Sequence, residues 1–265
     1  MPFLTDDGRP LDELLLAERP ADGYRFEVRA PFVYLDPVSG RRYEIPAARG
    51  TGTAAPGSSG AVGAGPHGVT DLASVPMSLW SFIASYGRQS APAVLHDERS
   101  IVAAELGDRR AALALRREDD RVFRTALREQ RVPLLRAWIM WGWIAADRER
   151  EFGGGAGAVF MAQAVVGALL VLGASVGAFW HPGWLAVVLV PALAAAAWGR
   201  LAPLMLLLNY SSAVLAPLIV LHLISLVPFR LLEAIVEIAA GGDPAGVVRP
   251  TVRPPARRPA APRGD

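Results

Sequence analysis

Two long stretches without a charged side chain constrain this sequence more than any other feature. Phe152 to Gly199 is 48 residues without Asp, Glu, Lys or Arg, and Leu201 to Phe229 is another 29, with Arg200 between them. A helix of about 20 apolar residues crosses the roughly 30 Å hydrocarbon core of a bilayer. We therefore predict an integral membrane protein with the lipid bilayer as its partner, in preference to a soluble protein with a buried helical hairpin.

The first stretch has room for two membrane spans and the second for one. His181, Pro182 and Gly183 form a turn signal, and Trp180 and Trp184 beside it are typical of the aromatic belt at a membrane interface. The sequence thus predicts a C-terminal bundle of about three transmembrane helices, in a membrane region over 152–229 with spans near 156–180, 184–199 and 212–229.

The arginines around these spans predict their orientation. Arg136, Arg148 and Arg150 precede the first span and the first turn carries no charge, so the positive-inside rule places the N-terminal domain in the cytoplasm. Three spans would leave the C-terminal tail outside, although its five arginines favour the inside. The conflict disappears if 201–229 is re-entrant or interfacial. We expect three spans, while two remain open as the alternative.

Beyond the spans the sequence changes character twice. Over 230–242, apolar residues recur at helical spacing opposite Glu233 and Glu237, which predicts a short amphipathic helix. Residues 243–265 contain six prolines and five arginines, a composition typical of a disordered tail. Near an anionic leaflet each arginine would contribute about 1 kcal/mol of attraction, and the alternative is a tail that stays in solvent.

Composition excludes several classes of function. Residues 1–151 carry 20 arginines against 21 acidic side chains, so this predicted soluble domain has no dense basic face for a nucleic acid. The absence of cysteine excludes a disulfide scaffold, a thiolate nucleophile and a cysteine-based metal site. All 27 basic residues are arginine, so catalysis by a lysine is excluded as well.

The soluble part is predicted to be α+β, with a small N-terminal antiparallel sheet followed by about four helices. Alternating apolar residues favour strands, apolar residues at helical spacing favour helices, and glycine, alanine and serine favour a flexible insertion over 47–69. The expected strands are 24–28, 32–35 and 42–45. The expected helices are 74–87, 90–106, one beginning at Asp119 or Asp120, and 133–146.

The order of several short motifs in the soluble part is characteristic of a known family. The motifs are, in chain order, Tyr43-Glu44-Ile45-Pro46, Thr70-Asp71-Leu72-Ala73-Ser74-Val75-Pro76, the segment from Trp80 to Gly87, Ala93-Val94-Leu95-His96-Asp97, and Asp120-Arg121-Val122-Phe123. Over roughly residues 30–146 the chain resembles the domain of unknown function family 1353, a small bacterial and phage-associated domain. The glycine-rich insertion before Thr70 and the membrane segments depart from the family's usual pattern. The resemblance implies a compact domain often carried by phages and prophages, and it implies no established reaction.

Four side chains of these motifs are candidates for chemistry: Asp71, His96, Asp97 and Asp120. If one loop and two helix starts meet at a common rim, His96, Asp71 and Asp120 could hold a divalent metal ion, which would lower the pKa of a bound water. Adjacent residues diverge by about 100° on a helix, so at most one of His96 and Asp97 points fully into such a site. In the structural alternative, Asp71 and Asp120 cap helices, and His96 is a core histidine bonded to Asp71.

Two other catalytic arrangements have less support. A Ser74–His96–Asp97 triad lacks the Gly-x-Ser-x-Gly elbow and places the aspartate next to its histidine. His67, His96, Asp97 and Asp120 follow the order of the His-Asp phosphohydrolases, which are all-helical, whereas His67 lies in a glycine-rich loop. We therefore expect a membrane-anchored interaction or accessory protein. A membrane-tethered metal-dependent hydrolase that uses the His96–Asp97 region is the alternative.

Overall fold

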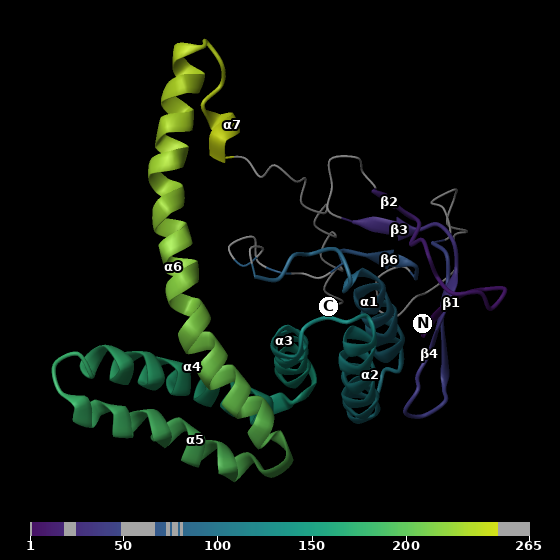
Figure 1. Cartoon of the computed structure of the whole chain (residues 1–265), viewed down its shortest axis with the longest axis horizontal. Helices are drawn as coiled ribbons and strands as arrows, with labels where there is room; N and C mark the ends of the chain where they lie inside the picture. The colour runs from purple at the N-terminus through teal and green to yellow at the C-terminus, as the bar shows by residue number, and fades with distance from the viewer. Residues whose placement is uncertain are drawn as a thin grey trace, which may run out of the picture.

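In the computed structural model, a layer of strands and three helices leads into a long apolar helical arm (Figure 1). The structure describes residues 2–18, 25–48, 67–72, 75, 79 and 82–248. Helices α1 (Ser90–Glu105), α2 (Arg109–Glu129) and α3 (Leu134–Phe152) lie between the strands and the arm. Most of the predicted insertion and most of the predicted tail lie outside the described residues.

Two small antiparallel sheets form the N-terminal layer, in agreement with the predicted antiparallel pairing. One sheet has the order β1-β4-β5 and consists of β1 (Phe3–Thr5), β4 (Phe32–Leu35) and β5 (Arg42–Ile45). The other has the order β2-β3-β6 and consists of β2 (Leu16–Glu18), β3 (Phe26–Val28) and β6 (Val69–Thr70). Tyr34 pairs with both Phe3 and Tyr43, so alternate apolar side chains of three strands gather on one face.

The core of the soluble part joins these strands to α1 and α2. Its buried members include Phe3, Val28, Phe32, Tyr34, Ile45, Val94, Leu95, Val122 and Ala126. Each Å² of apolar surface removed from water contributes about 25 cal/mol. Since Val94 and Leu95 immediately precede His96, this burial also fixes the turn of α1 that carries the candidate histidine.

Helix α2 begins ten residues before the predicted start at Asp119. Asp108 is its N-cap, and the Asp108 carboxylate accepts a hydrogen bond from the Arg110 amide at 3.0 Å. The prediction was wrong because Asp119 and Asp120 are buried in the middle of the helix, where each pairs with an arginine instead of capping a helix end.

Helix α3 is longer than predicted and ends at Phe152 instead of Ala146. The charged residues after Ala146 continue the helix because they form pairs along it. Arg150, for example, lies 2.7 Å from Asp147 one turn earlier.

The helix predicted over 74–87 lies partly outside the described residues. Its described end, from Phe82 to Gly87, forms turns and bends. A single turn closes where the Phe82 amide donates to the Leu79 carbonyl at 2.9 Å. The side-chain amide of Gln89 then donates to the carbonyl of Tyr86 at 2.8 Å. In a continuous helix this carbonyl would accept from a backbone amide, so the side chain of Gln89 takes the place of that donor.

Beyond Phe152 the chain forms the apolar arm. Helix α4 (Gly154–Gly177) leads away from the soluble part, the segments η2 (Pro182–Val188), α5 (Leu189–Ala195) and η3 (Ala196–Leu201) return, and α6 (Ala202–Ala239) follows, with a short α7 (Ala245–Val248) after it (Figure 1). Two stretches, Gly154–Gly177 and Pro182–Ala239, are long and apolar enough to cross a membrane. In their most apolar parts only 28% and 11% of the residues are buried, so they differ from the covered core helices of a soluble protein.

The structure supports two such stretches and does not clearly separate the three predicted spans. Gly199, with φ 53° and ψ −113°, breaks the second stretch within η3, three residues before α6 begins. The predicted span 212–229 is the middle of α6, which begins ten residues earlier and ends ten residues later. The short helix predicted over 230–242 is largely the end of α6. The charges at Arg230 and Glu233 do not interrupt it, because they pair across one turn at 2.8 Å.

Polar side chains connect the segments of the arm. Gln163 of α4 donates to the Ala194 carbonyl at 3.2 Å and accepts from the Trp198 indole at 2.9 Å. Tyr210 of α6 donates to the Val188 carbonyl at 2.7 Å. Because an unpartnered polar group is costly in apolar surroundings, these bonds favour one arrangement of α4, α5 and α6.

Candidate functional site

Helix α1 places His96 between two carboxylates. Its Nε2 lies 3.4 Å from Oδ1 of Asp120 on α2, and its Nδ1 lies 3.9 Å from Oδ1 of Asp97. The imidazole also packs against the Phe123 ring, with 5.1 Å between the centroids. Burial lowers the pKa of His96, but the two carboxylates outweigh it and raise the pKa above its ordinary value. Burial raises the pKa of Asp97, whose carboxylate accepts a hydrogen bond from Thr70.

Asp120 also belongs to a buried ion network that joins α2 to α3. The carboxylate is fully buried, and its Oδ2 accepts from Arg148 of α3. Arg148 in turn donates to Glu149 at 2.9 Å, and Arg117 reaches the same glutamate at 3.3 Å. The carboxylate predicted either to cap a helix or to bind a metal is therefore the counter-ion of a buried arginine, and it connects His96 to the last turns of α3.

Asp71 lies at the solvent-facing side of this network. It is exposed in the loop after β6, and its charge adds to the effect of burial in raising the pKa of Asp97. The structure thus brings His96, Asp97 and Asp120 together, while Ser74 of the alternative triad lies outside the described residues. Within the described ranges, no group of three or more His, Cys, Asp or Glu side chains could hold a metal ion.

His67 is tied to α1 by two glutamates. Its Nδ1 lies 2.5 Å from Glu98, and its Nε2 lies 3.0 Å from Glu105. Glu98 also accepts from the Gly68 amide at 3.0 Å. The hydrogen bond with Glu98 is the largest contribution to a raised pKa of His67. Glu98 and Glu105 are seven residues apart and share one helix face, so both can reach the same imidazole.

We expect the titration of His67 to make the folded chain less stable as the pH rises. Since folding raises its pKa, the stabilisation by the charged imidazole is complete below the unfolded pKa of about 6.5 and is lost as the pH rises through the folded value. Thermal unfolding of the full chain between about pH 5 and about pH 9 should show a shallower decline for His67→Asn. The difference should be small because 44% of the side chain is exposed, and identical profiles would contradict the assignment.

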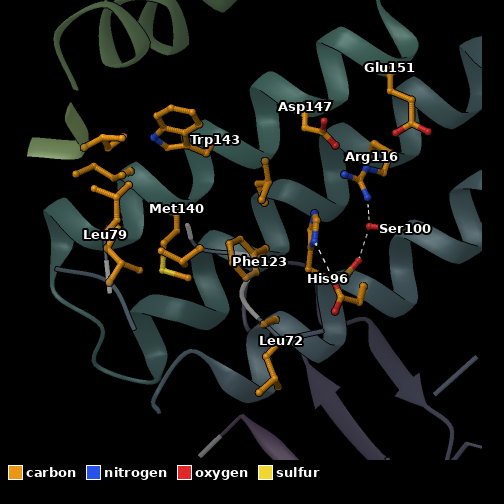
Figure 2. A pocket seen from close by; sticks show the side chains of 17 residues that line it. Leu72, Leu79, His96, Ser100, Arg116, Phe123, Met140, Trp143, Asp147 and Glu151 are labelled. Atoms are coloured by element: carbon orange, nitrogen blue, oxygen red, sulfur yellow. Dashed lines mark hydrogen bonds and ion pairs between the residues drawn. The ribbon is translucent and has the colours of Figure 1, made fainter. Parts of the chain in front are cut away.

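A cavity of about 650 Å³ opens beside His96, bordered by α1, α2, α3 and one residue of α6 (Figure 2). This volume falls within the range of roughly 300–1,000 Å³ of small-molecule sites. The polar and charged residues of its lining are His96, Asp97, Ser100, Arg116, Asp147 and Glu151. The apolar lining includes Leu72, Leu79, Phe123, Ile139, Met140, Trp143 and Ile219.

Sequence reasoning missed Arg116, together with Ser100, Asp147 and Glu151. Arg116 is only 4% exposed and lies on the α2 face that also carries Asp119 and Phe123. An arginine at a position where the helical spacing predicts a buried apolar residue is the signal that could have identified Arg116. Ile219, also in the lining, comes from the arm, far along the chain, and no local pattern predicts that contact.

The comparisons with known proteins concern the middle of the chain. Residues 59–144 match the family described as "Protein of unknown function (DUF1353)". The resemblance to DUF1353 is confirmed. No curated protein and no solved structure matches the chain. The DUF1353 segment contains α1, α2 and most of α3, whereas β1 to β5 and the arm lie outside it.

Several residues of the site come from beyond the DUF1353 segment. Asp147, Arg148 and Glu151 follow it on α3, and Ile219 belongs to α6. The buried ion pair of Asp120 and the walls of the cavity are therefore completed by sequence that the family match does not cover.

Proposed function

We propose that this chain is an integral membrane protein and that its DUF1353 segment belongs to a cytoplasmic interaction or accessory module anchored to the membrane. The apolar surface of the arm carries the proposal. At the turn after α4, Phe179 is 89% and Trp180 is 79% exposed, and many apolar side chains between Val214 and Ile238 are exposed on α6. Monomeric soluble proteins rarely expose apolar patches beyond a few hundred Å², and a bilayer would cover this surface.

Contacts of α3 support a domain that is held closely against the arm. Helix α3 contacts α2 on the soluble side and both α4 and α6 on the other. A Cβ at Gly142 of α3 would lie 2.5 Å from the Leu207 side chain of α6. Arg109 of α2 donates to the Phe152 carbonyl at 2.9 Å, where α4 is about to begin. Because of these contacts, helix α3 connects the DUF1353 segment to the arm directly, without a flexible linker.

Positive charge at the same junction supports the cytoplasmic orientation. Arg148 is buried and neutralised by its carboxylate partners, so it does not contribute a free charge near the membrane. Arg109 and Arg150 are exposed at this junction, and Arg150 also pairs with Asp147 at its surface. The positive-inside rule counts exposed arginines close to the end of a span, so Arg109 and Arg150 support the proposed orientation.

The bonding of the candidate residues supports a structural role. Asp120 accepts from Arg148, Asp97 accepts from Thr70, and His96 lies between the two carboxylates. These contacts join β6, α1, α2 and α3. We infer that the cluster stabilises the module and that the module acts by binding.

The absence of cysteine from the chain makes single-cysteine labelling a direct test. Ser39→Cys is exposed in the turn between β4 and β5, Phe179→Cys is exposed at the turn after α4, and Leu169→Cys is exposed along α4. In intact spheroplasts, a membrane-impermeant maleimide should label Phe179→Cys and should label Ser39→Cys only after lysis. Leu169→Cys should remain unreactive until detergent removes the lipid.

Two results would contradict the proposal in different ways. Release of the unmodified chain from membranes by alkaline carbonate would exclude membrane insertion. Labelling of Ser39→Cys in intact spheroplasts would exclude the cytoplasmic orientation while leaving insertion in place.

A further inference from the structure

The cavity beside His96 is amphipathic. In Figure 2, Leu79 and Met140 lie at one side, whereas Ser100, Arg116 and Glu151 lie at the other. A ligand that fills this space therefore needs an apolar body and a polar end. The features of each end restrict its chemistry further.

Arg116 is a buried cation without a direct ion pair among the described residues. It donates to the Ser100 hydroxyl, but its Nε has no hydrogen-bond partner among the described residues. The nearby acids of α2 form their ion pairs with other arginines, and Asp119 acts on Arg116 only through electrostatic attraction without a direct pair. Removing a guanidinium from water without a counter-ion is costly, and an anionic group in the cavity would reduce that cost.

Acidic side chains at the same end restrict the kind of anionic ligand. Asp147 and Glu151 of α3 line the cavity near Arg116 and are exposed at its edge (Figure 2). Asp97 also belongs to the cavity lining, whereas Asp147 also pairs with Arg150 at 2.7 Å. A purely anionic head group would meet repulsion from these carboxylates. A zwitterionic head group can place its phosphate at Arg116 and its ammonium at Asp147 and Glu151.

The arm contributes an apolar residue to the cavity. Ile219 of α6 contributes to its wall, and Val220 and Leu221 beside it are 53% and 65% exposed. The proposed function places α6 in contact with lipid. An acyl chain could therefore reach the cavity along α6 without leaving apolar surroundings.

We propose that this cavity binds a single-chain zwitterionic phospholipid of the phosphoethanolamine type, taken from the bilayer. The acyl chain occupies the space near Met140 and Ile219, the phosphate contacts Arg116, and the ammonium lies near Asp147 and Glu151. This inference rests on the proposed function for the source of the lipid. The fit of the lipid to the cavity rests on the lining residues alone.

Lysophosphatidylethanolamine is the probe that tests this proposal. The full chain, purified in a neutral maltoside detergent, would be titrated with it and examined by native mass spectrometry. Ile139→Trp fills the apolar end and Arg116→Met removes the buried charge, so each should weaken binding by about tenfold or more, which corresponds to at least about 1.4 kcal/mol. Leu135→Trp, one turn earlier on α3 and 69% exposed, is the matched control and should bind like the unmodified chain.

The head group is tested with lysophosphatidylglycerol and a monoacylglycerol of equal chain length. We expect lysophosphatidylethanolamine to bind most tightly of the three. Equal binding of the monoacylglycerol would overturn the role of Arg116, and unchanged binding by Ile139→Trp would overturn the choice of cavity. If Arg116→Met does not fold, the two tryptophan variants still decide the question. The assay does not require membrane insertion, so its failure is distinct from release by alkaline carbonate.

Discussion

Arg148→Ala should lower the free energy of unfolding by about 3–5 kcal/mol, because it removes one partner of a buried ion pair. Arg148 is 3% exposed and Asp120 is fully buried. Without the guanidinium, the carboxylate keeps His96 as its neighbour at 3.4 Å and loses its strongest donor. Glu149, also buried, loses a donor at 2.9 Å. Two carboxylates would then be left inside the protein with too little positive charge.

This prediction can be measured by urea unfolding of the full chain in detergent, followed by tryptophan fluorescence. Arg150→Ala, two residues along the same helix, is the control. Its pair with Asp147 is exposed, with 65% and 50% of the two side chains accessible, so the loss should be about 0–1 kcal/mol. Similar losses for the two variants would show that the buried network contributes no more than a surface pair.

Gly157→Ala should destabilise the junction of α3 and α4 by about 1–3 kcal/mol or more, as overpacking does. A Cβ at Gly157 would lie 2.0 Å from the carbonyl oxygen of Glu149. The same carbonyl accepts the Gly153 amide at 2.9 Å, and it belongs to the backbone, so it cannot rotate away as a side chain could. The first turn of α4 would have to move off the last turns of α3.

Gly155→Ala is a matched control for this replacement. It lies in the same turn, and a Cβ there would have nothing within 4 Å. Alanine is the better helix former, so this variant should be neutral or slightly stabilised. Thermal unfolding and limited proteolysis near Gly153 would detect the difference. Equal resistance of the two variants would mean that the close approach at Gly157 is not required.

Features that depend on local sequence were predictable. The uncharged stretches are helical, α1 begins at Ser90 as predicted, and the alternating segment around Tyr34 is a strand. Helical and strand periodicities, turn residues and long apolar stretches act within a few residues of one another. The start of α2 was mispredicted because an aspartate that caps a helix and an aspartate buried within one, such as Asp120, look the same in the sequence.

Features that depend on distant partners were not predictable. The sequence near Asp120 does not reveal that Arg148 will neutralise it, and Arg148 itself was interpreted as a charge flanking the membrane. Likewise, His96 was a candidate from its motif, but the cavity beside it needs α3 and Ile219 to exist. These contacts arise when the helices pack together. The order of the helices along the chain does not specify which of their side chains will meet.

The length of α6 has a mechanical consequence. Its 38 residues extend for about 57 Å at 1.5 Å per residue, whereas the hydrocarbon core is about 30 Å thick. A helix longer than the bilayer tilts or extends beyond it. Because the first turns of α6 pack against α3 and α4 through Leu204 and Leu208, a tilt of this helix is transmitted to the domain in front of it. In the proposed membrane-inserted state, bilayer thickness and the angle between the membrane and the domain are therefore expected to be coupled through this one continuous helix.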